Sequence, residues 1–264
     1  MSPKTLRAPA KLTLSLRVTG VVDDGPRRGY HLIDAVMTTL DLHDVIEIEE
    51  LPAGSTSQVE YAGPFSEGLN DGAESGTDLV TRALRTAGRQ ARVTVTKNIP
   101  HGGGLGGGSA DAAAVLRWAG VTDLETAANI GADVAFCLAG RGRARVGGIG
   151  EIVEPLPPEP GVVTLIVPPF SVSTPAVYRA FDELEKLGLA RHDDHVVNEH
   201  LENDLETAAM RVEPRLTEWK SRISRAVGSD PTLAGSGATW FVIGDHGHLA
   251  ERLPEATVAV TRYQ

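Results

Sequence analysis

Apolar and polar residues alternate in several short stretches of the chain, and this period of two predicts β-strands. In residues 11–18, apolar side chains alternate with four polar ones, so the two sets lie on opposite faces of one strand. From this pattern alone we expect the polar set to face solvent. The polar set is Lys11, Thr13, Ser15 and Arg17. Further strands are predicted at 44–50, 59–61, 91–97, 239–243 and 257–261, within 141–155, and at the continuous apolar run 162–167.

Apolar residues spaced three or four apart predict helices between these strands. Thr77 is a candidate N-cap of a helix whose apolar residues end at Ala87. Residues 173–175, Ser-Thr-Pro, begin a helix that we expect to end near residue 187, because proline is tolerated in a first turn. We expect segment 52–75 to be mostly surface loop. Other helices are predicted at 111–119, from Asp123, in two parts of 203–227 split at Pro214, and near 247–252.

This order of elements predicts an α+β protein with a mixed sheet. The second half runs strand, helices, strand, helix, strand. Prolines in segment 155–161 stop the elements on either side, which makes this segment the best candidate boundary. We therefore expect an N-terminal domain at 1–156 and a C-terminal domain at 157–264.

Composition narrows the class of protein. The formal net charge of -10 argues against nucleic acid as a general partner. The single cysteine, Cys137, excludes an intrachain disulfide framework and fits a reducing compartment. We find no apolar run of the ~18 residues that a membrane span needs, and no signal peptide. We therefore expect a cytoplasmic protein without a membrane partner, either a monomer or a homodimer.

One stretch, residues 100–110, stands out because six of its eleven residues are glycine. It follows a predicted strand and precedes a predicted helix, so its bare N–H groups lie at the positive end of a helix dipole. Such a site binds anions, most often phosphate. The candidate phosphate-binding residues are Pro100, His101, Gly102, Gly103, Gly104, Leu105, Gly106, Gly107, Gly108, Ser109 and Ala110.

Two common phosphate loops fit this stretch poorly. A Walker A loop needs a lysine directly after its last glycine, and none follows here. A dinucleotide fingerprint can be written on Gly102, Gly104 and Gly107. This fingerprint also needs a second strand that ends in an acidic residue ~20 residues later. At that distance, segment 121–130 has the pattern of a helix instead of a strand, so the fit is poor. A flexible linker is disfavoured because strong strand and helix patterns bracket the glycines.

A third loop fits at every position. The spacing Pro-x-x-x-Gly-Leu-Gly-x-x-Ser of residues 100–109 resembles the phosphate loop of the GHMP kinases. The resemblance extends in order over nearly the whole chain, to the 4-diphosphocytidyl-2-C-methyl-D-erythritol kinases of that group. The segments that carry it are 9–12, 24–25, 30–31, 100–116, 131–137, 203–206 and 235–239.

The resemblance implies a two-lobed GHMP kinase fold. An N-terminal mixed α/β lobe carries the glycine loop and binds ATP, and the C-terminal lobe is a ferredoxin-like α+β unit. The implied reaction moves the γ-phosphoryl group of ATP to the C2 hydroxyl of a cytidine diphosphate sugar alcohol. By resemblance, Asp133 is the catalytic base and Lys11 the cation near the transferred group. Mg²⁺ is expected with ATP, with Ser109 as its protein contact.

The resemblance also implies where the substrate binds. His31 is a candidate to hydrogen-bond the cytosine edge, with Tyr30 and Tyr178 as candidate stacking aromatics. Thr13 stands where the family has asparagine, and residues 26–29 form an insertion before the Tyr-His pair. A second backbone donor loop is expected at Gly235, Ser236 and Gly237.

Other interpretations stay open. Asp133 alone fits a helix cap or first-turn carboxylate, and Tyr178 alone fits a core residue. Homoserine and mevalonate kinases share the glycine loop, and a nucleotide-binding protein without catalysis would keep it as well. The presence of both Lys11 and Asp133 argues against the non-catalytic protein. The His192–His195 cluster matches no metal-site spacing, and we expect it at the surface.

Overall fold

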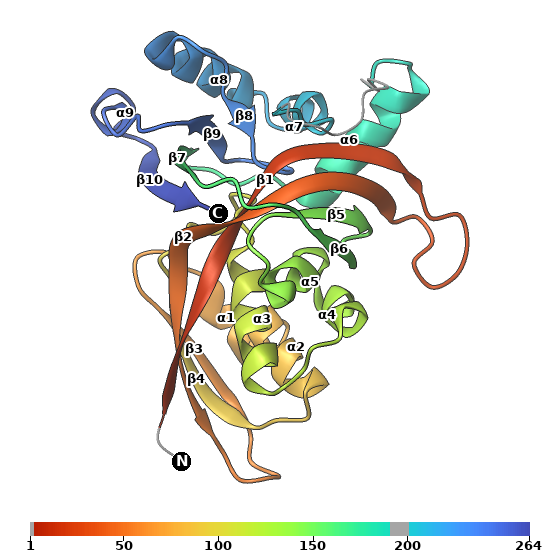
Figure 1. The fold of residues 1–264 in the computed structure, drawn as a ribbon, viewed down its shortest axis with the longest axis vertical. Helices are drawn as coiled ribbons and strands as arrows, with labels where there is room; N and C mark the ends of the chain where they lie inside the picture. The colour runs from red at the N-terminus through yellow and green to blue at the C-terminus, as the bar shows by residue number, and fades with distance from the viewer. Residues whose placement is uncertain (1–2, 191–200) are drawn as a thin grey trace.

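The computed structural model describes residues 3–190 and 201–264, and its sheet is built on two long antiparallel strands (Figure 1). β1 (Lys4–Val21) pairs with β2 (His31–Glu50) along most of its length. β2 then pairs with β4 (Ala91–Thr96) at one end and with β5 (Ala144–Gly148) near its start. β3 (Gln58–Ala62) joins β4 in parallel, and β6 (Ile152–Pro155) joins β5.

The C-terminal strands extend the same sheet. β7 (Gly161–Val167) lies between β9 (Trp240–Ile243) and β10 (Thr257–Tyr263), and β8 (Thr232–Leu233) pairs with β9. β10 also reaches β2, where Tyr263 pairs with Leu40. The mixed α+β architecture predicted from the sequence is confirmed. The division into two domains at residue 156 remains a prediction.

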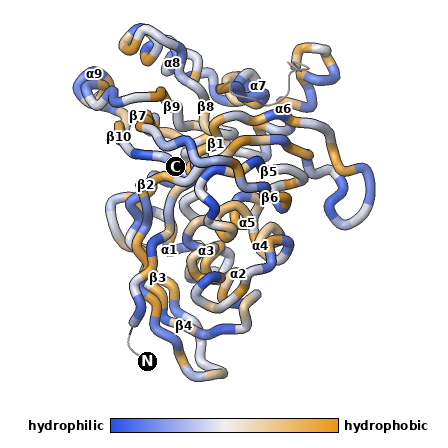
Figure 2. The backbone as a smooth tube through the Cα atoms, viewed as in Figure 1, coloured by the Kyte–Doolittle hydropathy of each residue, from blue (hydrophilic) through white to orange (hydrophobic). Residues whose placement is uncertain are grey.

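Helices pack on the sheet in two groups. The N-terminal group lies beside β1, β2 and β4, and the C-terminal group surrounds β7 to β9 at the top of Figure 1. Figure 2 shows hydrophobic segments along β3, β4 and the first group. No described helix has the length and apolar character to cross a membrane. The helices are α1 (Leu69–Ser75), α2 (Leu79–Thr86), α3 (Gly107–Trp118), α4 (Leu124–Ile130), α5 (Ala132–Ala139), α6 (Thr174–Lys186), α7 (Glu206–Val212), α8 (Arg215–Val227) and α9 (Leu249–Arg252).

Most predicted elements are present, and the differences have local causes. The N-cap of α2 is Asp78 instead of Thr77, because the Asp78 carboxylate accepts the Thr81 N–H at 2.9 Å. The predicted start of a helix at Asp123 is confirmed, with Asp123 as the N-cap residue of α4, and so is the break between α7 and α8 at Pro214. The expected loop at 52–75 contains α1, a short helix flanked by left-handed glycines that leaves little apolar signal.

The expectation that the polar face of residues 11–18 meets solvent is wrong. Lys11, Thr13 and Ser15 are only 4%, 2% and 7% exposed. Among the described strands β1 pairs only with β2, but its other edge is covered by the glycine loop, where the Lys11 N–H donates to the Leu105 carbonyl at 3.0 Å, and by a bridge from Leu16 to Asn203. Lys11 and Thr13 therefore face a cavity inside the protein instead of bulk water.

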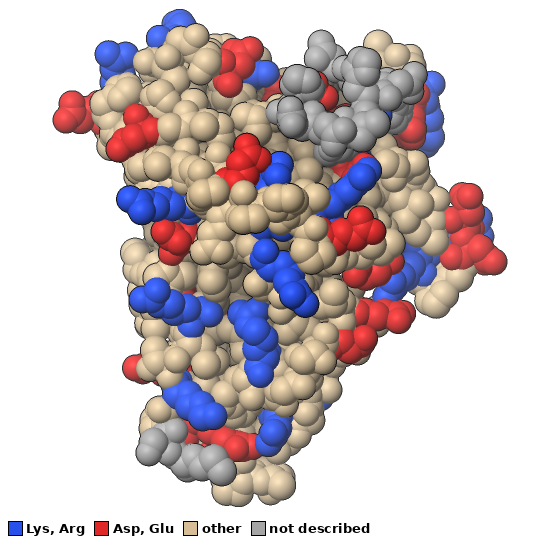
Figure 3. Space-filling view, viewed as in Figure 1, with Lys and Arg blue, Asp and Glu red and all other residues tan. Residues whose placement is uncertain are grey.

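Charge is distributed unevenly over the surface. On the face in Figure 3, Lys and Arg side chains form a column over the middle of the molecule, and most of the acidic side chains in view lie nearer its edges. The net charge of -10 therefore does not describe this face.

Candidate active site

The glycine loop ends in the N-terminus of α3. Gly106 is the N-cap residue with φ 67°, and the Ala110 N–H donates to its carbonyl at 2.8 Å. This is the first turn of the helix, so the N–H groups of Gly107, Gly108 and Ser109 precede the helical hydrogen bonds. The helix predicted at 111–119 thus starts four residues earlier, which brings its positive end into the loop.

The loop is packed too tightly for side chains at four of its glycines, and a Cβ on Gly102 would lie 2.9 Å from the Ser171 Cβ. A Cβ on Gly104 would lie 2.4 Å from the Ala234 carbonyl oxygen, and one on Gly103 would lie 2.4 Å from the Thr239 hydroxyl. A Cβ on Gly106 would meet the Lys11 side chain at 2.8 Å. The loop is therefore held between β1 and residues 234–239.

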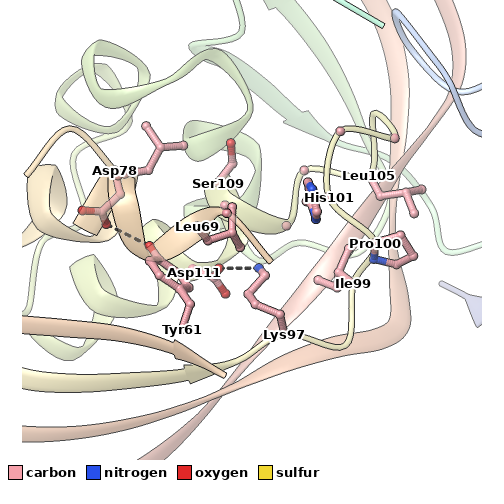
Figure 4. A pocket seen from close by; sticks show the side chains of 18 of the residues that line it. Tyr61, Leu69, Asp78, Lys97, Ile99, Pro100, His101, Leu105, Ser109 and Asp111 are labelled. Carbon is pink, nitrogen blue, oxygen red and sulfur yellow. Dashed lines mark hydrogen bonds and ion pairs between the residues drawn. The ribbon is translucent and has the colours of Figure 1, made fainter. Parts of the chain in front are cut away.

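Two cavities lie on either side of this loop. The first, of about 420 Å³, is lined by the loop from Pro100 to Ser109 and by side chains that our sequence analysis missed (Figure 4). Ala110 packs in the core beneath it. The missed polar side chains are Tyr61, Asp78, Lys97 and Asp111.

A buried ionic cluster underlies the first cavity. The Lys97 ammonium contacts Asp111 at 2.6 Å and also pairs with Asp44. Asp44 further accepts the N–H groups of Asn98 and Ile99, at 2.5 and 2.8 Å. Burial raises the pKa of Asp111 to about 7; Lys97 lowers it and the Asp44 carboxylate raises it. Among the described residues, the second Asp111 oxygen has no hydrogen-bond partner.

The second cavity, of about 580 Å³, collects residues from distant parts of the chain. Gly104 lies in the wall of both cavities, so the glycine loop is the partition that the two cavities share. Every predicted substrate residue except Gly237 lines it. Among its lining residues are Lys11, Thr13, Tyr30, His31, Gly104, Asp133, Tyr178, Asp182, Gly235 and Ser236.

Lys11 and Asp133 meet in this second cavity. The Lys11 ammonium lies 3.1 Å from the Asp133 carboxylate and donates to the Thr13 hydroxyl, also at 3.1 Å. The Lys11 side chain is 5% exposed and that of Asp133 is 30% exposed. Asp133 lies in the first turn of α5, whose N-cap is Gly131. A carboxylate at this position is stabilised by the helix dipole while it stays open to the cavity.

The aromatic residues of the second cavity are arranged around His31. Its ring stacks on Tyr178 with centroids 4.6 Å apart, and its Nε2 lies 2.6 Å from the Asp182 carboxylate. Burial, with a smaller contribution from Asp133, raises the pKa of Tyr178 to about 12. Tyr30 is 59% exposed at the rim. Our sequence analysis missed Asp182, although its spacing of four from Tyr178 places both on one face of α6.

The segment at 235–237 is held from two sides. The Asn203 amide donates to the carbonyls of Leu233 and Gly235, at 2.8 and 2.6 Å. The Thr174 and Ser236 hydroxyls lie 2.7 Å apart. Gly235 and Ser236 therefore face the second cavity from a fixed backbone, and the carbonyl of Gly237 turns toward Gly104.

The described residues contain no group of three or more His, Cys, Asp or Glu side chains that could hold a metal ion. Ser109 lines the first cavity, and its role as a magnesium contact remains a prediction. The His192–His195 cluster lies outside the described residues.

Comparison with known proteins identifies the family. The family described as GHMP kinases N terminal domain matches residues 77–141. A 4-diphosphocytidyl-2-C-methyl-D-erythritol kinase of Paracoccus denitrificans (strain Pd 1222) is 41% identical over 251 residues, covering 89% of this chain and 84% of the relative. The chain belongs to the 4-diphosphocytidyl-2-C-methyl-D-erythritol kinase family.

Other members and solved structures agree with this assignment. The Geobacillus kaustophilus (strain HTA426) kinase of the same name is 34% identical over 270 residues, covering 94% of this chain and 91% of the relative. A crystal structure of 4-(cytidine 5'-diphospho)-2C-methyl-D-erythritol kinase aligns at 31% identity with a TM-score of 0.70, over 99% of this chain and 100% of that one. Mevalonate kinase of L. major, 12% identical with a TM-score of 0.67, covers 100% and 97% and shares the fold. The GHMP kinase fold predicted for this chain is confirmed.

Proposed function

We propose that this protein is an ATP-dependent kinase of the C2 hydroxyl of 4-diphosphocytidyl-2-C-methyl-D-erythritol, in non-mevalonate isoprenoid precursor biosynthesis. Its relatives carry the name of that kinase. The observation that carries the proposal is the Lys11–Asp133 pair at 3.1 Å, in a cavity that shares Gly104 with the cavity of the glycine loop. A phosphoryl group bound at the loop would lie beside an acceptor in the second cavity.

In this proposal ATP occupies the first cavity. Its phosphates accept hydrogen bonds from the N–H groups of Gly107, Gly108 and Ser109, and the helix dipole of α3 favours their negative charge. The tight packing of Gly103, Gly104 and Gly106 fixes this backbone before ATP arrives. Donors that are already in place need no rearrangement when charge develops in the reaction.

Transfer then takes place between the cavities. The acceptor oxygen forms a bond to the γ-phosphorus as its proton passes to Asp133, and the bond from that phosphorus to the bridging oxygen breaks to release ADP. Lys11 lies 3.1 Å from Asp133. Its charge holds the carboxylate in place and offsets the negative charge that develops on the transferred group. Thr13 fixes the ammonium by accepting its hydrogen bond.

Mg²⁺ is expected with ATP, where it would neutralise phosphate charge. In ATP sites this ion is held mostly by phosphate oxygens and water, with one or two protein groups. A first cavity that offers the Ser109 hydroxyl at a helix N-terminus fits that pattern. We therefore propose Ser109 as its protein contact.

The cytidine diphosphate part of the acceptor would extend from Lys11 toward the aromatic residues. Tyr30 and Tyr178 offer ring faces, His31 offers ring nitrogens, and the backbone at Gly235 and Ser236 offers donors near the diphosphate. The acidic net charge supports the expectation of no nucleic-acid partner, and the single cysteine supports a cytoplasmic location.

An assay that couples ADP release to a colour change tests the proposal. The purified protein would be given ATP, Mg²⁺ and, in turn, 4-diphosphocytidyl-2-C-methyl-D-erythritol, mevalonate, homoserine and galactose. We expect turnover of the first acceptor only. Turnover of one of the others alone would overturn the substrate assignment, and ATP binding without any turnover would favour a non-catalytic nucleotide-binding protein.

A further inference from the structure

Two residues on one face of α6 hold the imidazole of His31. Tyr178 stacks on the ring, with centroids 4.6 Å apart and planes 29° apart, and Asp182 contacts Nε2 at 2.6 Å. Tyr178 and Asp182 are four residues apart, so they project from successive turns of the helix toward the same neighbour. The first contact fixes the plane of the ring and the second fixes its rotation within that plane.

The contact with Asp182 also decides where the imidazole carries its proton. An aspartate carboxylate at neutral pH accepts hydrogen bonds and donates none. Nε2 must therefore be the N–H nitrogen of His31. In a neutral imidazole the other nitrogen, Nδ1, then keeps its lone pair and acts as an acceptor. The His31 side chain is 13% exposed and lines the second cavity.

We propose that Asp182 is a positioning residue that makes His31 select cytosine over uracil, an inference that rests on the proposed function. At the edge where the two bases differ, cytosine carries an exocyclic amine donor and uracil carries a carbonyl acceptor. The lone pair of Nδ1 accepts the amine of cytosine. Against uracil it meets a second acceptor, so neither group gains a hydrogen bond from the other.

Binding of CDP and UDP, measured by calorimetry, tests this selection without requiring turnover. In Asp182→Asn the side-chain amide can donate to Nε2, which moves the proton to Nδ1 and converts the acceptor into a donor. We expect the preference for CDP over UDP to fall by about tenfold, as for the loss of one hydrogen bond. In steady-state assays the change should lie in KM for the cytidine substrate, with kcat altered less than about twofold, because Asp182 touches no reacting atom.

A neighbouring carboxylate provides the matched control. Glu183 follows Asp182 on α6, is 62% exposed and pairs with Arg211 at 3.5 Å, away from His31. Glu183→Gln should therefore leave the CDP preference unchanged. If Asp182→Asn weakens CDP and UDP binding equally, Asp182 has only a structural role and the inference is wrong.

Nitrogen-15 NMR of the imidazole gives an independent readout. The His31 signals would be assigned by their loss in His31→Gln. We expect the Nε2–H tautomer in the parent protein and a shift toward Nδ1–H in Asp182→Asn; an unchanged tautomer would contradict the inference. Absence of turnover with every acceptor would overturn the proposed function, whereas the CDP and UDP affinities and the tautomer decide the role of Asp182 in either case.

Discussion

The two cavities beside the glycine loop are built in different ways. The first takes most of its wall from one continuous segment, residues 97–109, and its donors are backbone N–H groups at the start of α3. The second is assembled from side chains of β1, β2, α5 and α6 and from residues 235–236. A site for a phosphate chain can be encoded locally, whereas a site for a particular acceptor needs the folded chain to bring distant groups together.

The polar side chains of the two cavities also differ in how far they are exposed to solvent. Beneath the first cavity, Lys97, Asp44 and Asp111 are buried, and the Lys97 ammonium contacts both carboxylates. In the second cavity Asp133 is 30% exposed, and Tyr30 is more than half exposed. The first set therefore stabilises a rigid frame, and the second remains available to a ligand. Substitutions in the two sets should have different consequences, chemical in one cavity and structural in the other.

The largest effect is expected for Asp133→Asn in the second cavity. An amide has nearly the same shape and still contacts Lys11, but it cannot take the proton of the acceptor hydroxyl. We expect kcat to fall by about 10²–10⁴-fold, the usual contribution of a general base, while ATP binding and the melting temperature change little. Steady-state kinetics, ATP titration and thermal unfolding measure the three quantities.

Glu125→Gln is a control for the loss of one negative charge, because this carboxylate on α4 is 74% exposed. It should keep near-parent kcat. If Asp133→Asn does so too, Asp133 is not the base, and its pairing with Lys11 only orders the cavity.

The glycine loop was readable in the sequence because its signal is contiguous, but the surroundings of Lys11 were not. Alternation along β1 placed Lys11 and Thr13 correctly on one face, yet it could not tell that other parts of the chain cover that face. Only the resemblance to the kinase family indicated that Lys11 and Asp133 belong to the same site. The pairing of His31 with Asp182 spans 151 positions, and no local pattern carries such a contact.

The ionic cluster under the first cavity was missed for a related reason. In the sequence, Lys97 and Asp44 read as ordinary charged residues at strand ends, where solvent exposure is the default. Their burial becomes visible only when α3 packs on β1 and β2 and brings Asp111 to the Lys97 ammonium. Helix α1 escaped prediction because seven residues between two glycines give too short a periodic pattern.

A smaller effect is expected for Gly104→Ala, which alters the wall common to both cavities. Gly104 has φ 79°, and its new methyl group would lie 2.4 Å from the Ala234 carbonyl oxygen, a backbone atom that cannot turn away. The loop must then shift by a large fraction of an ångström. A displacement of this size costs about 10²-fold in rate when it misaligns reacting groups, so we expect kcat/KM to fall for both ATP and the acceptor.

Gly108→Ala is the matched control for the fold of this loop. Gly108 has helical backbone angles, and a methyl group there meets its nearest neighbour, Leu79, at an ordinary 3.6 Å. Its melting temperature should match that of the parent, whereas Gly104→Ala should melt several degrees lower. If kcat/KM of Gly104→Ala falls for ATP alone or for the acceptor alone, Gly104 does not form a wall common to both cavities.

The smallest effect is a dependence of stability on pH that belongs to the first cavity. Burial raises the pKa of Asp111 to about 7, from about 4 in an unfolded chain. The folded protein thus holds a proton that the unfolded chain releases. The resulting stabilisation is complete below about pH 4 and is lost as the pH rises through about 7.

Asp111→Asn removes this titration and keeps the pair of Lys97 and Asp44. The free energy of unfolding of the variant, relative to the parent, should therefore rise by roughly 2–3 kcal/mol between about pH 5 and pH 8 and level off above it. Urea unfolding at half-unit steps of pH measures the difference, with the exposed Asp71→Asn as the control that should follow the parent. A difference independent of pH would mean that Lys97 keeps both neighbouring carboxylates ionised, and the first cavity would then carry a net negative charge beneath the phosphate loop.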